Sequence, residues 1–276
     1  MNSIRPLLLR KRAAVMAVIN ITPDSFSDGA LFLDPNMALS HSIKMIQNGA
    51  DILDIGAEST RPGAEAVSLQ EELDRAIPVI ECLSAETDVP ISIDTYKPEV
   101  MEAAINAGAQ MINDVNALQS DGAIDIVAKY QVPVCLMHMH GQPKTMQEKP
   151  VYKEVVNDVL TFLQQRIEFC VKHKIAQSDI VIDPGIGFGK TLEHNLSLLK
   201  QVSRLKSESG CNVMIGVSRK SLIDKLLGRA VDKRLPASIG LAVQAVLNGA
   251  KIVRVHDVSA TRDAIRSVEA VQRAAV

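Results

Sequence analysis

The chain has 276 residues, of which 47% are hydrophobic and 22% are charged, and its formal net charge is −2. This composition is too apolar for a disordered protein and too often interrupted by polar residues for a membrane protein. A charge so close to zero argues against broad electrostatic binding to nucleic acid, although local basic sites for a small anion remain compatible with it.

The cysteines are widely separated and form no CxxC pair; they are Cys82, Cys135, Cys170 and Cys211. They therefore give no support to a zinc ribbon or a thioredoxin-like site. Scattered thiols in a chain of this size fit a reducing compartment. The apolar run at 6–9 is too short for a signal-peptide core, and no stretch of about 18 apolar residues spans a bilayer. We therefore predict a cytoplasmic protein with no membrane partner.

Short apolar runs alternate along the chain with longer runs whose apolar residues recur at helical spacing. The short runs predict strands at residues 15–21, 51–56, 90–95, 111–115, 133–139, 180–187, 213–218 and 251–256. A repeated strand–helix order predicts parallel strands joined by right-handed crossovers. Eight such units favour a closed (β/α)8 barrel of the TIM type over an open doubly wound sheet. No linker or charge block divides the chain, so we predict a single domain over residues 1–276.

Polar side chains fall at or just beyond the predicted strand ends, where barrel enzymes carry their active sites. In chain order they are Asn20, Arg61, Asp94, Asn113, His138, Asp183, Ser218, Arg219, Lys220, Arg254 and His256. Any one of them is more often a helix cap, a turn former or a satisfied structural group than a ligand. Their recurrence on nearly every strand predicts a shared site, because burying so many unpartnered polar groups would cost on the order of several kcal/mol.

These side chains separate into two chemical groups. The acidic and amidic group suits a planar heterocycle with adjacent N–H donors, and it consists of Asp94, Asn113, Asp183 and nearby Lys220. The other group suits a diphosphate, with Mg2+ as a possible companion, and it consists of Asn20, Arg61, Ser218, Arg219, Arg254 and His256. Closure of the barrel predicts that the first and last strands are neighbours, which would bring Asn20 beside Arg254 and His256.

Three other motifs are weaker. Residues 185–191 resemble a phosphate-binding P-loop, but Pro184 stands where that motif needs glycine, so Lys190 is a poor candidate phosphate ligand. His138 and His140 share one predicted strand face, yet no third ligand at zincin spacing accompanies them. Lys220 is compatible with a Schiff base in an aldolase-like barrel and equally with a hydrogen-bonding role.

Seven sequence blocks, in order and covering nearly the whole chain, resemble the signatures of dihydropteroate synthases. They are residues 20–29 (NITPDSFSDG), 54–63 (DIGAESTRPG), 92–95 (SIDT), 112–115 (INDV), 182–190 (IDPGIGFGK), 216–220 (GVSRK) and 254–257 (RVHD). The resemblance implies a (β/α)8 barrel of folate biosynthesis that condenses 6-hydroxymethyl-7,8-dihydropterin diphosphate with 4-aminobenzoate. Members of that family are usually homodimers, use Mg2+ and are targets of sulfonamides.

The resemblance also implies a role for each matching residue. The pterin would be held by Asp94, Asn113, Asp183, Lys220, Met137 and Phe188. The diphosphate would be held by Asn20, Arg61, Arg254 and His256, with Asn20 also serving the metal. The aminobenzoate site would be framed by Phe26, Thr60, Arg61, Pro62, Ser218 and Arg219.

The expected chemistry is a dissociative displacement, in which diphosphate leaves before the arylamine attacks. The segments 22–33 and 59–67 are rich in Gly, Pro, Ser and Asp, and we expect them to close over bound diphosphate. Three alternatives remain open from the sequence: a methyltransferase acting on methyltetrahydrofolate, a non-catalytic pterin-binding protein, and an aldolase that uses Lys220.

Overall fold

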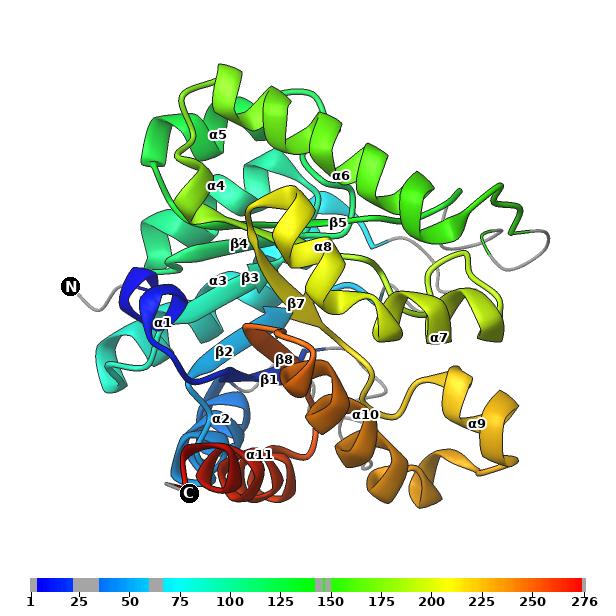
Figure 1. The fold of residues 1–276 in the computed structure, drawn as a ribbon. Helices are drawn as coiled ribbons and strands as arrows, with labels where there is room; N and C mark the ends of the chain where they lie inside the picture. The colour runs from blue at the N-terminus through cyan, green and yellow to red at the C-terminus, as the bar shows by residue number, and fades with distance from the viewer. Residues whose placement is uncertain (1–3, 22–34, 60–66, 142–145, 147–149, 275–276) are drawn as a thin grey trace.

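Eight parallel strands form a closed barrel in a computed structural model that describes residues 4–21, 35–59, 67–141, 146 and 150–274 (Figure 1). The strands are β1 (Ala14–Asn20), β2 (Ile52–Gly56), β3 (Ile91–Asp94), β4 (Met111–Asp114), β5 (Val134–Met137), β6 (Ile180–Asp183), β7 (Asn212–Ile215) and β8 (Ile252–Val255). Each strand pairs with the next along the chain, and β8 pairs with β1. The predicted (β/α)8 barrel is therefore confirmed.

Helices surround the barrel in Figure 1, and most of them connect one strand to the next. They are α1 (Arg5–Leu9), α2 (Pro35–Gln47), α3 (Leu69–Glu86), α4 (Pro98–Ala107), α5 (Ala123–Tyr130), α6 (Val155–Lys172), α7 (Leu192–Lys200), α8 (Val202–Ser209), α9 (Ser221–Leu227), α10 (Leu235–Leu247) and α11 (Val258–Arg273). Short 3-10 turns lie at η1 (Gln177–Asp179) and η2 (Val231–Lys233). Within the described parts of the chain, no helix is both long enough and apolar enough to cross a bilayer.

Glycines end several of the connecting helices. Gly108 follows α4 with φ of 118°, a left-handed conformation that favours glycine. A Cβ at this position would also collide with the hydroxyl of Ser84 on α3. The glycine therefore both ends the helix and permits α3 and α4 to pack closely.

Two apolar layers stabilise the barrel. The larger lies between the strands and the helices, as the burial of Ile19, Ile55 and Ile93 on the strands and of Leu83 on α3 illustrates. The smaller fills the barrel interior, and it consists of Ala14, Met16, Ile52, Met111, Cys135, Val181, Met214 and Ile252. Ile4 and Leu8 join this inner cluster, so α1 and the residue before it close the end of the barrel at which the strands begin.

Several strands end a few residues earlier than the sequence predicted. The sequence predicted strands at 133–139 and 180–187, whereas β5 ends at Met137 and β6 at Asp183. Gly185 and Gly187 have positive φ angles, which turn the chain away from the strand direction. The polar residues past each strand end therefore belong to loops at the rim of the barrel.

Candidate active site

A layer of polar side chains lies directly above the apolar interior of the barrel. Because side chains alternate along a strand, the residue two positions beyond an inward-facing one also faces inward. The residues two positions beyond members of the inner cluster, on the same strands, are Asp54, Asn113, Met137, Asp183 and Arg254. Asp94 joins them through its neighbours, since it pairs in register with Gly56 on β2 and Asn113 on β4.

Arg254 lies between two buried carboxylates. Its Nε donates to Asp54 Oδ2 at 2.6 Å, and its Nη2 donates to Asp94 Oδ2 at 2.8 Å. Asn113 Nδ2 also donates to Asp54 Oδ2, at 3.1 Å. The acidic and basic groups expected from the sequence therefore meet here, because the guanidinium from the basic group pairs with a carboxylate of the acidic one.

Asp54 is a site residue that the sequence reasoning did not select. It belongs to the second signature block, and it follows the buried Ile52 by two positions on a strand whose side chains are all buried. The period-two pattern of an inward-facing strand would have identified it. Its side chain is fully buried and links Arg254 to Asn113.

Several buried acceptors of this layer have no hydrogen-bond partner among the described residues. These atoms are Oδ1 of Asp54, Oδ1 of Asp94 and the hydroxyl oxygen of Ser92. Buried polar atoms in native proteins are nearly always paired, so unpaired ones at a rim indicate a place where a ligand donates. Burial raises the pKa of Asp94 to about 7, although the charge of Arg254 acts in the opposite direction.

Asp183 and Lys220 form the opposite wall of the polar layer. Asp183 Oδ1 accepts a 2.7 Å bond from the backbone N–H of Gly185, and burial raises the pKa of this carboxyl group. Lys220 Nζ donates to the carbonyl of Ile186 at 2.5 Å and lies 4.8 Å from the centre of the Phe188 ring. Burial lowers the pKa of Lys220 to about 8.

Apart from Arg61, which lies outside the described residues, the residues expected to bind the diphosphate lie on the neighbouring strands β1, β7 and β8 or just after them. His256 Nδ1 lies 3.0 Å from the Ser218 hydroxyl, which also accepts from the His256 backbone N–H at 3.2 Å. A Cβ on Gly56 would lie 3.5 Å from Asn20 Oδ1 and 3.8 Å from Asp94 Oδ2, so Asn20 reaches the rim beside the carboxylates. The predicted closure of β8 onto β1 is confirmed.

Arg219 is committed to a different partner. Its guanidinium forms a bidentate pair with Asp257, through bonds of 3.0 and 2.5 Å, and its own φ is 59°. Its backbone N–H donates to the hydroxyl of Ser238. Asp257 precedes α11 but its side chain makes no capping bond to that helix, and it orients Arg219 instead.

Four of the predicted aminobenzoate residues lie outside the described residues: Phe26, Thr60, Arg61 and Pro62. The expected closing segments at 22–33 and 59–67 fall outside them as well, apart from Ser59 and Val67. The described part of the chain holds no group of three or more His, Cys, Asp or Glu side chains that could bind a metal ion.

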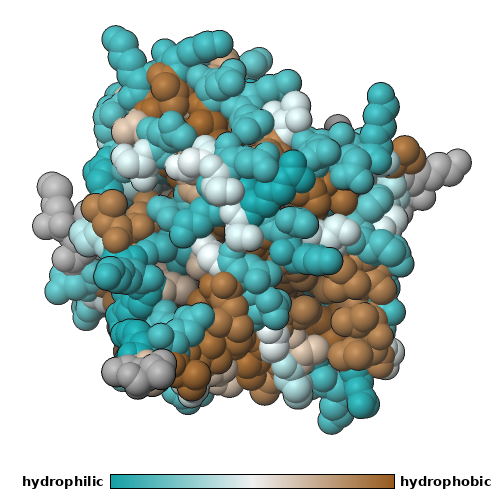
Figure 2. Space-filling view, in the orientation of Figure 1, coloured by the Kyte–Doolittle hydropathy of each residue, from teal (hydrophilic) through white to brown (hydrophobic). Residues whose placement is uncertain are grey.

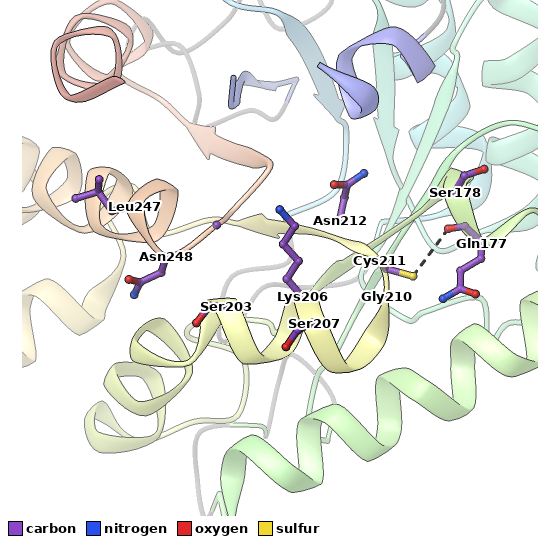
Figure 3. Close-up of a pocket in the computed structure, with 11 residues that line it drawn as sticks. Gln177, Ser178, Ser203, Lys206, Ser207, Gly210, Cys211, Asn212, Leu247 and Asn248 are labelled. Carbon is purple, nitrogen blue, oxygen red and sulfur yellow. Dashed lines mark hydrogen bonds between the residues drawn. The ribbon is translucent and has the colours of Figure 1, made fainter. Parts of the chain in front are cut away.

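A surface hollow of about 570 Å³ lies far from this rim, beside the N-terminal ends of β7 and β8 (Figure 3). Its amide side chains are already engaged with backbone carbonyls: Gln177 donates to Ser209, Asn212 to Leu8 and Asn248 to Leu199. None of the predicted site residues lines it. The hollow therefore lies apart from the predicted site residues, and the candidate active site is the polar rim.

Comparisons with known proteins identify the family of this chain. A family model described as pterin binding enzyme matches residues 16–256. The dihydropteroate synthase of Haemophilus influenzae is 46% identical over 260 residues, which are 94% of each chain. A solved structure of Xanthomonas albilineans dihydropteroate synthase with 4-aminobenzoic acid is 48% identical and superposes with a TM-score of 0.91, covering 96% of this chain and 95% of that one.

A second Xanthomonas albilineans structure, in complex with 7,8-dihydropteroate, is 45% identical with a TM-score of 0.87 and covers 96% of this chain and 95% of that one.

Proposed function

Because this chain belongs to the dihydropteroate synthase family of pterin-binding enzymes, which are transferases of folate synthesis, we propose how its rim performs the condensation. The substrates are 6-hydroxymethyl-7,8-dihydropterin diphosphate and 4-aminobenzoate, and the products are 7,8-dihydropteroate and diphosphate. The observation that carries the proposal is the pair of buried carboxylate oxygens at the rim, on Asp54 and Asp94, that have no donor among the described residues.

The pterin supplies the missing donors. Its guanidine-like edge presents adjacent N–H groups, and a carboxylate accepts two parallel bonds from such an edge. Asp183, Asp94 and Asn113 surround the space into which that edge fits, while Met137 and Phe188 pack against the ring. Lys220 adds a donor beside Phe188, 4.8 Å from its ring centre.

Arg254, His256 and Asn20 hold the diphosphate. Arg254 is already oriented by two carboxylates, so little reorganisation is needed when charge develops on the leaving group. Asn20 offers one neutral oxygen, which suits Mg2+ bound mainly through phosphate oxygens and water. When bound there, Mg2+ would supply Lewis-acid stabilisation of the diphosphate charge.

The reaction is a dissociative displacement. The C–O bond between the pterin methylene and the diphosphate breaks, and both electrons leave with the diphosphate. The methylene cation is delocalised into the pterin ring and lies near the negative charges of Asp54 and Asp94, which favour it electrostatically. The amine nitrogen of 4-aminobenzoate then forms the C–N bond with its lone pair and loses a proton. No protein nucleophile is needed.

Three further properties belong to the same proposal. The protein forms a homodimer, which is supported by apolar side chains exposed along α9, η2 and α10: Leu226, Leu227, Val231, Leu235 and Leu247. Figure 2 shows apolar surface gathered on this side of the molecule. Sulfonamides compete with 4-aminobenzoate for its site, and the enzyme acts in the cytoplasm on small molecules, without nucleic acid or membrane partners.

An assay of diphosphate release tests the proposed function. Release must require both the pterin diphosphate and 4-aminobenzoate, and it must stop when Mg2+ is removed with a chelator and resume when Mg2+ is returned. Release in the absence of the arylamine would identify a hydrolase instead and would contradict the proposal.

A further inference from the structure

The turn from Asp183 to Lys190 forms one wall of the proposed pterin pocket, since it carries both Asp183 and Phe188. It contacts the chain after β5 so closely that side chains are excluded. A Cβ on Gly185 would collide with the carbonyl oxygen of His138, and a Cβ on Gly189 would lie 2.5 Å from that of His140. Both glycines also have positive φ angles. The 183–190 turn therefore packs directly against the backbone of the chain that follows β5.

Lys190 lies behind this wall and is almost completely buried, with 1% of its surface exposed. Its Nζ lies 3.0 Å from His138 Nδ1, 3.3 Å from the His138 carbonyl and 2.9 Å from the Phe188 carbonyl. Burial lowers the pKa of Lys190 to about 7. When Nζ is protonated it has three N–H donors, and here each can find an acceptor. One side chain thus joins both sides of the contact between the turn and the end of β5.

The state of His138 fits this role. Burial and the nearby charge of Lys190 lower the pKa of His138 to about 3, so its imidazole is neutral and Nδ1 accepts from the ammonium. The His138 ring is held at 5.0 Å from Phe162 and 6.0 Å from Tyr152. The hydroxyl of Tyr152 donates to the Gly189 carbonyl at 2.9 Å, which adds a second tie to the same turn.

We propose that Lys190 is a positioning residue for the pterin: its ammonium fixes the 183–190 turn against β5 and so holds Phe188 and Asp183 in place for the ring. The inference rests on the proposed function, because it concerns the same pocket. Lys190 serves neither as a phosphate ligand nor as a group that touches the substrate. Its contribution is to ground-state binding of the pterin and depends on the three contacts of its Nζ.

The test compares Lys190→Met with Lys251→Met. Lys251 is a matched control because it is also buried and donates to backbone carbonyls, those of Arg10 and Arg12, but lies at the opposite end of the barrel. We expect Lys190→Met to raise the Kd for a pterin without diphosphate, measured by fluorescence, about tenfold, which corresponds to about 1.4 kcal/mol. The KM for 4-aminobenzoate should change less than twofold, and Lys251→Met should leave both values unchanged.

A pterin Kd within twofold of the wild-type value would overturn the proposal, and so would an equal rise in Lys251→Met, since that would indicate general loosening. If Lys190→Met does not fold, His138→Leu decides the question, because it removes one of the three acceptors and leaves the carbonyls. We then expect a rise of about threefold, and an unchanged Kd counts against the role. Pterin binding is measured without turnover, so failure here is distinct from failure of the condensation assay.

Discussion

Asp51 and Asp94 are buried carboxylates at opposite ends of the barrel, and both pair with arginine. At the end where the strands begin, Asp51 binds Arg10 at 2.7 Å and also Arg262, and it accepts from the backbone N–H of Val15. At the rim, Asp94 binds Arg254 alone and keeps one oxygen without a partner among the described residues. Protein donors therefore use the hydrogen-bonding capacity of Asp51, whereas they use that of Asp94 only in part.

The pKa values of the two groups follow from this difference. Burial acts to raise the pKa of Asp51, but the bonds from Arg10, Arg262 and Val15 outweigh burial and leave the pKa below its ordinary value. For Asp94 burial prevails, and the pKa rises to about 7. A saturated ionic cluster stabilises the fold, whereas an unsaturated one retains binding capacity for a ligand. The predictions below separate these two uses of buried charge.

The largest effect is expected for Arg254→Ala at the rim. The variant loses the guanidinium that stabilises the leaving diphosphate, so turnover should fall by about 100- to 1,000-fold. It also leaves Asp54 and Asp94 buried without their arginine, so we expect a stability loss of about 3–5 kcal/mol. Steady-state kinetics and urea unfolding measure the two effects, and wild-type turnover in a folded variant would remove Arg254 from the site.

At the opposite end, Arg262→Met should damage stability and spare catalysis. Arg262 ties the carbonyl of Gly49 to Asp51, and its side chain is 5% exposed. Asp51 keeps its other arginines in the variant, so we expect a loss of about 2–3 kcal/mol rather than the full cost of an unpaired charge. The KM values of the folded fraction should stay within twofold of wild type. A change in the KM for the pterin substrate alone would show that Arg262 also affects binding, and would contradict the distinction between the two ends of the barrel.

A smaller effect on binding alone is expected for Asp183→Asn. The substitution turns a charge-assisted pair with the pterin into a neutral one, so pterin binding should weaken by about 1–3 kcal/mol. Fluorescence titration with a pterin gives the Kd directly. Wild-type affinity in this variant would exclude Asp183 from the pocket.

The smallest expected effect is a difference in how pH acts on stability. The folded-state pKa of Asp94 is raised, so between about pH 4 and 7 the folded state holds more protons at this group and its contribution to stability falls as pH rises. The pKa of Asp51 is lowered, so its contribution is present above its unfolded pKa and is lost as pH falls through its folded pKa.

Urea unfolding checks the sign, between about pH 5 and 7 for Asp94→Asn and from neutral pH to below about pH 4 for Asp51→Asn. Relative to wild type, Asp94→Asn should gain stability as pH rises from about 5 to 7, on the order of 1 kcal/mol, because it lacks the carboxylate that burial disfavours. Asp51→Asn should lose stability relative to wild type as pH rises through the acid range. If the free energy of unfolding depended on pH in the same way in both variants, the two carboxylates would not differ in their pKa shifts.

Much of the fold was predictable, because hydrophobic periodicity depends only on local sequence. The polar residues at strand ends could also be assigned to one rim, since parallel barrel strands all end on the same side. Pairing across the rim was not predictable. The period-two position of Asp54 was available from its strand, but its partners on β4 and β8 leave no local signal in the sequence.

The role of Lys190 was likewise hidden from sequence. The comparison with a P-loop directed attention to phosphate, whereas the side chain lies against His138, 52 positions earlier in the chain. Contacts between turns of different βα units depend on the barrel closing, and no spacing within one unit encodes them. The pairing between the acidic and the basic group was hidden for the same reason: Arg254 meets Asp94 only after β8 and β3 converge on the interior.

Finally, the helix α1 has a practical consequence for how this protein can be handled. Ile4 and Leu8 cover Met16, Ile52 and the other side chains at the base of the inner cluster. Ile4 and α1 therefore shield this end of the barrel interior from water. Trimming the chain to begin at β1 would open that cluster to water directly beneath the polar layer. Purification tags and fusion partners should therefore be joined on the far side of α11, a helix that lies on the outside of the barrel (Figure 1).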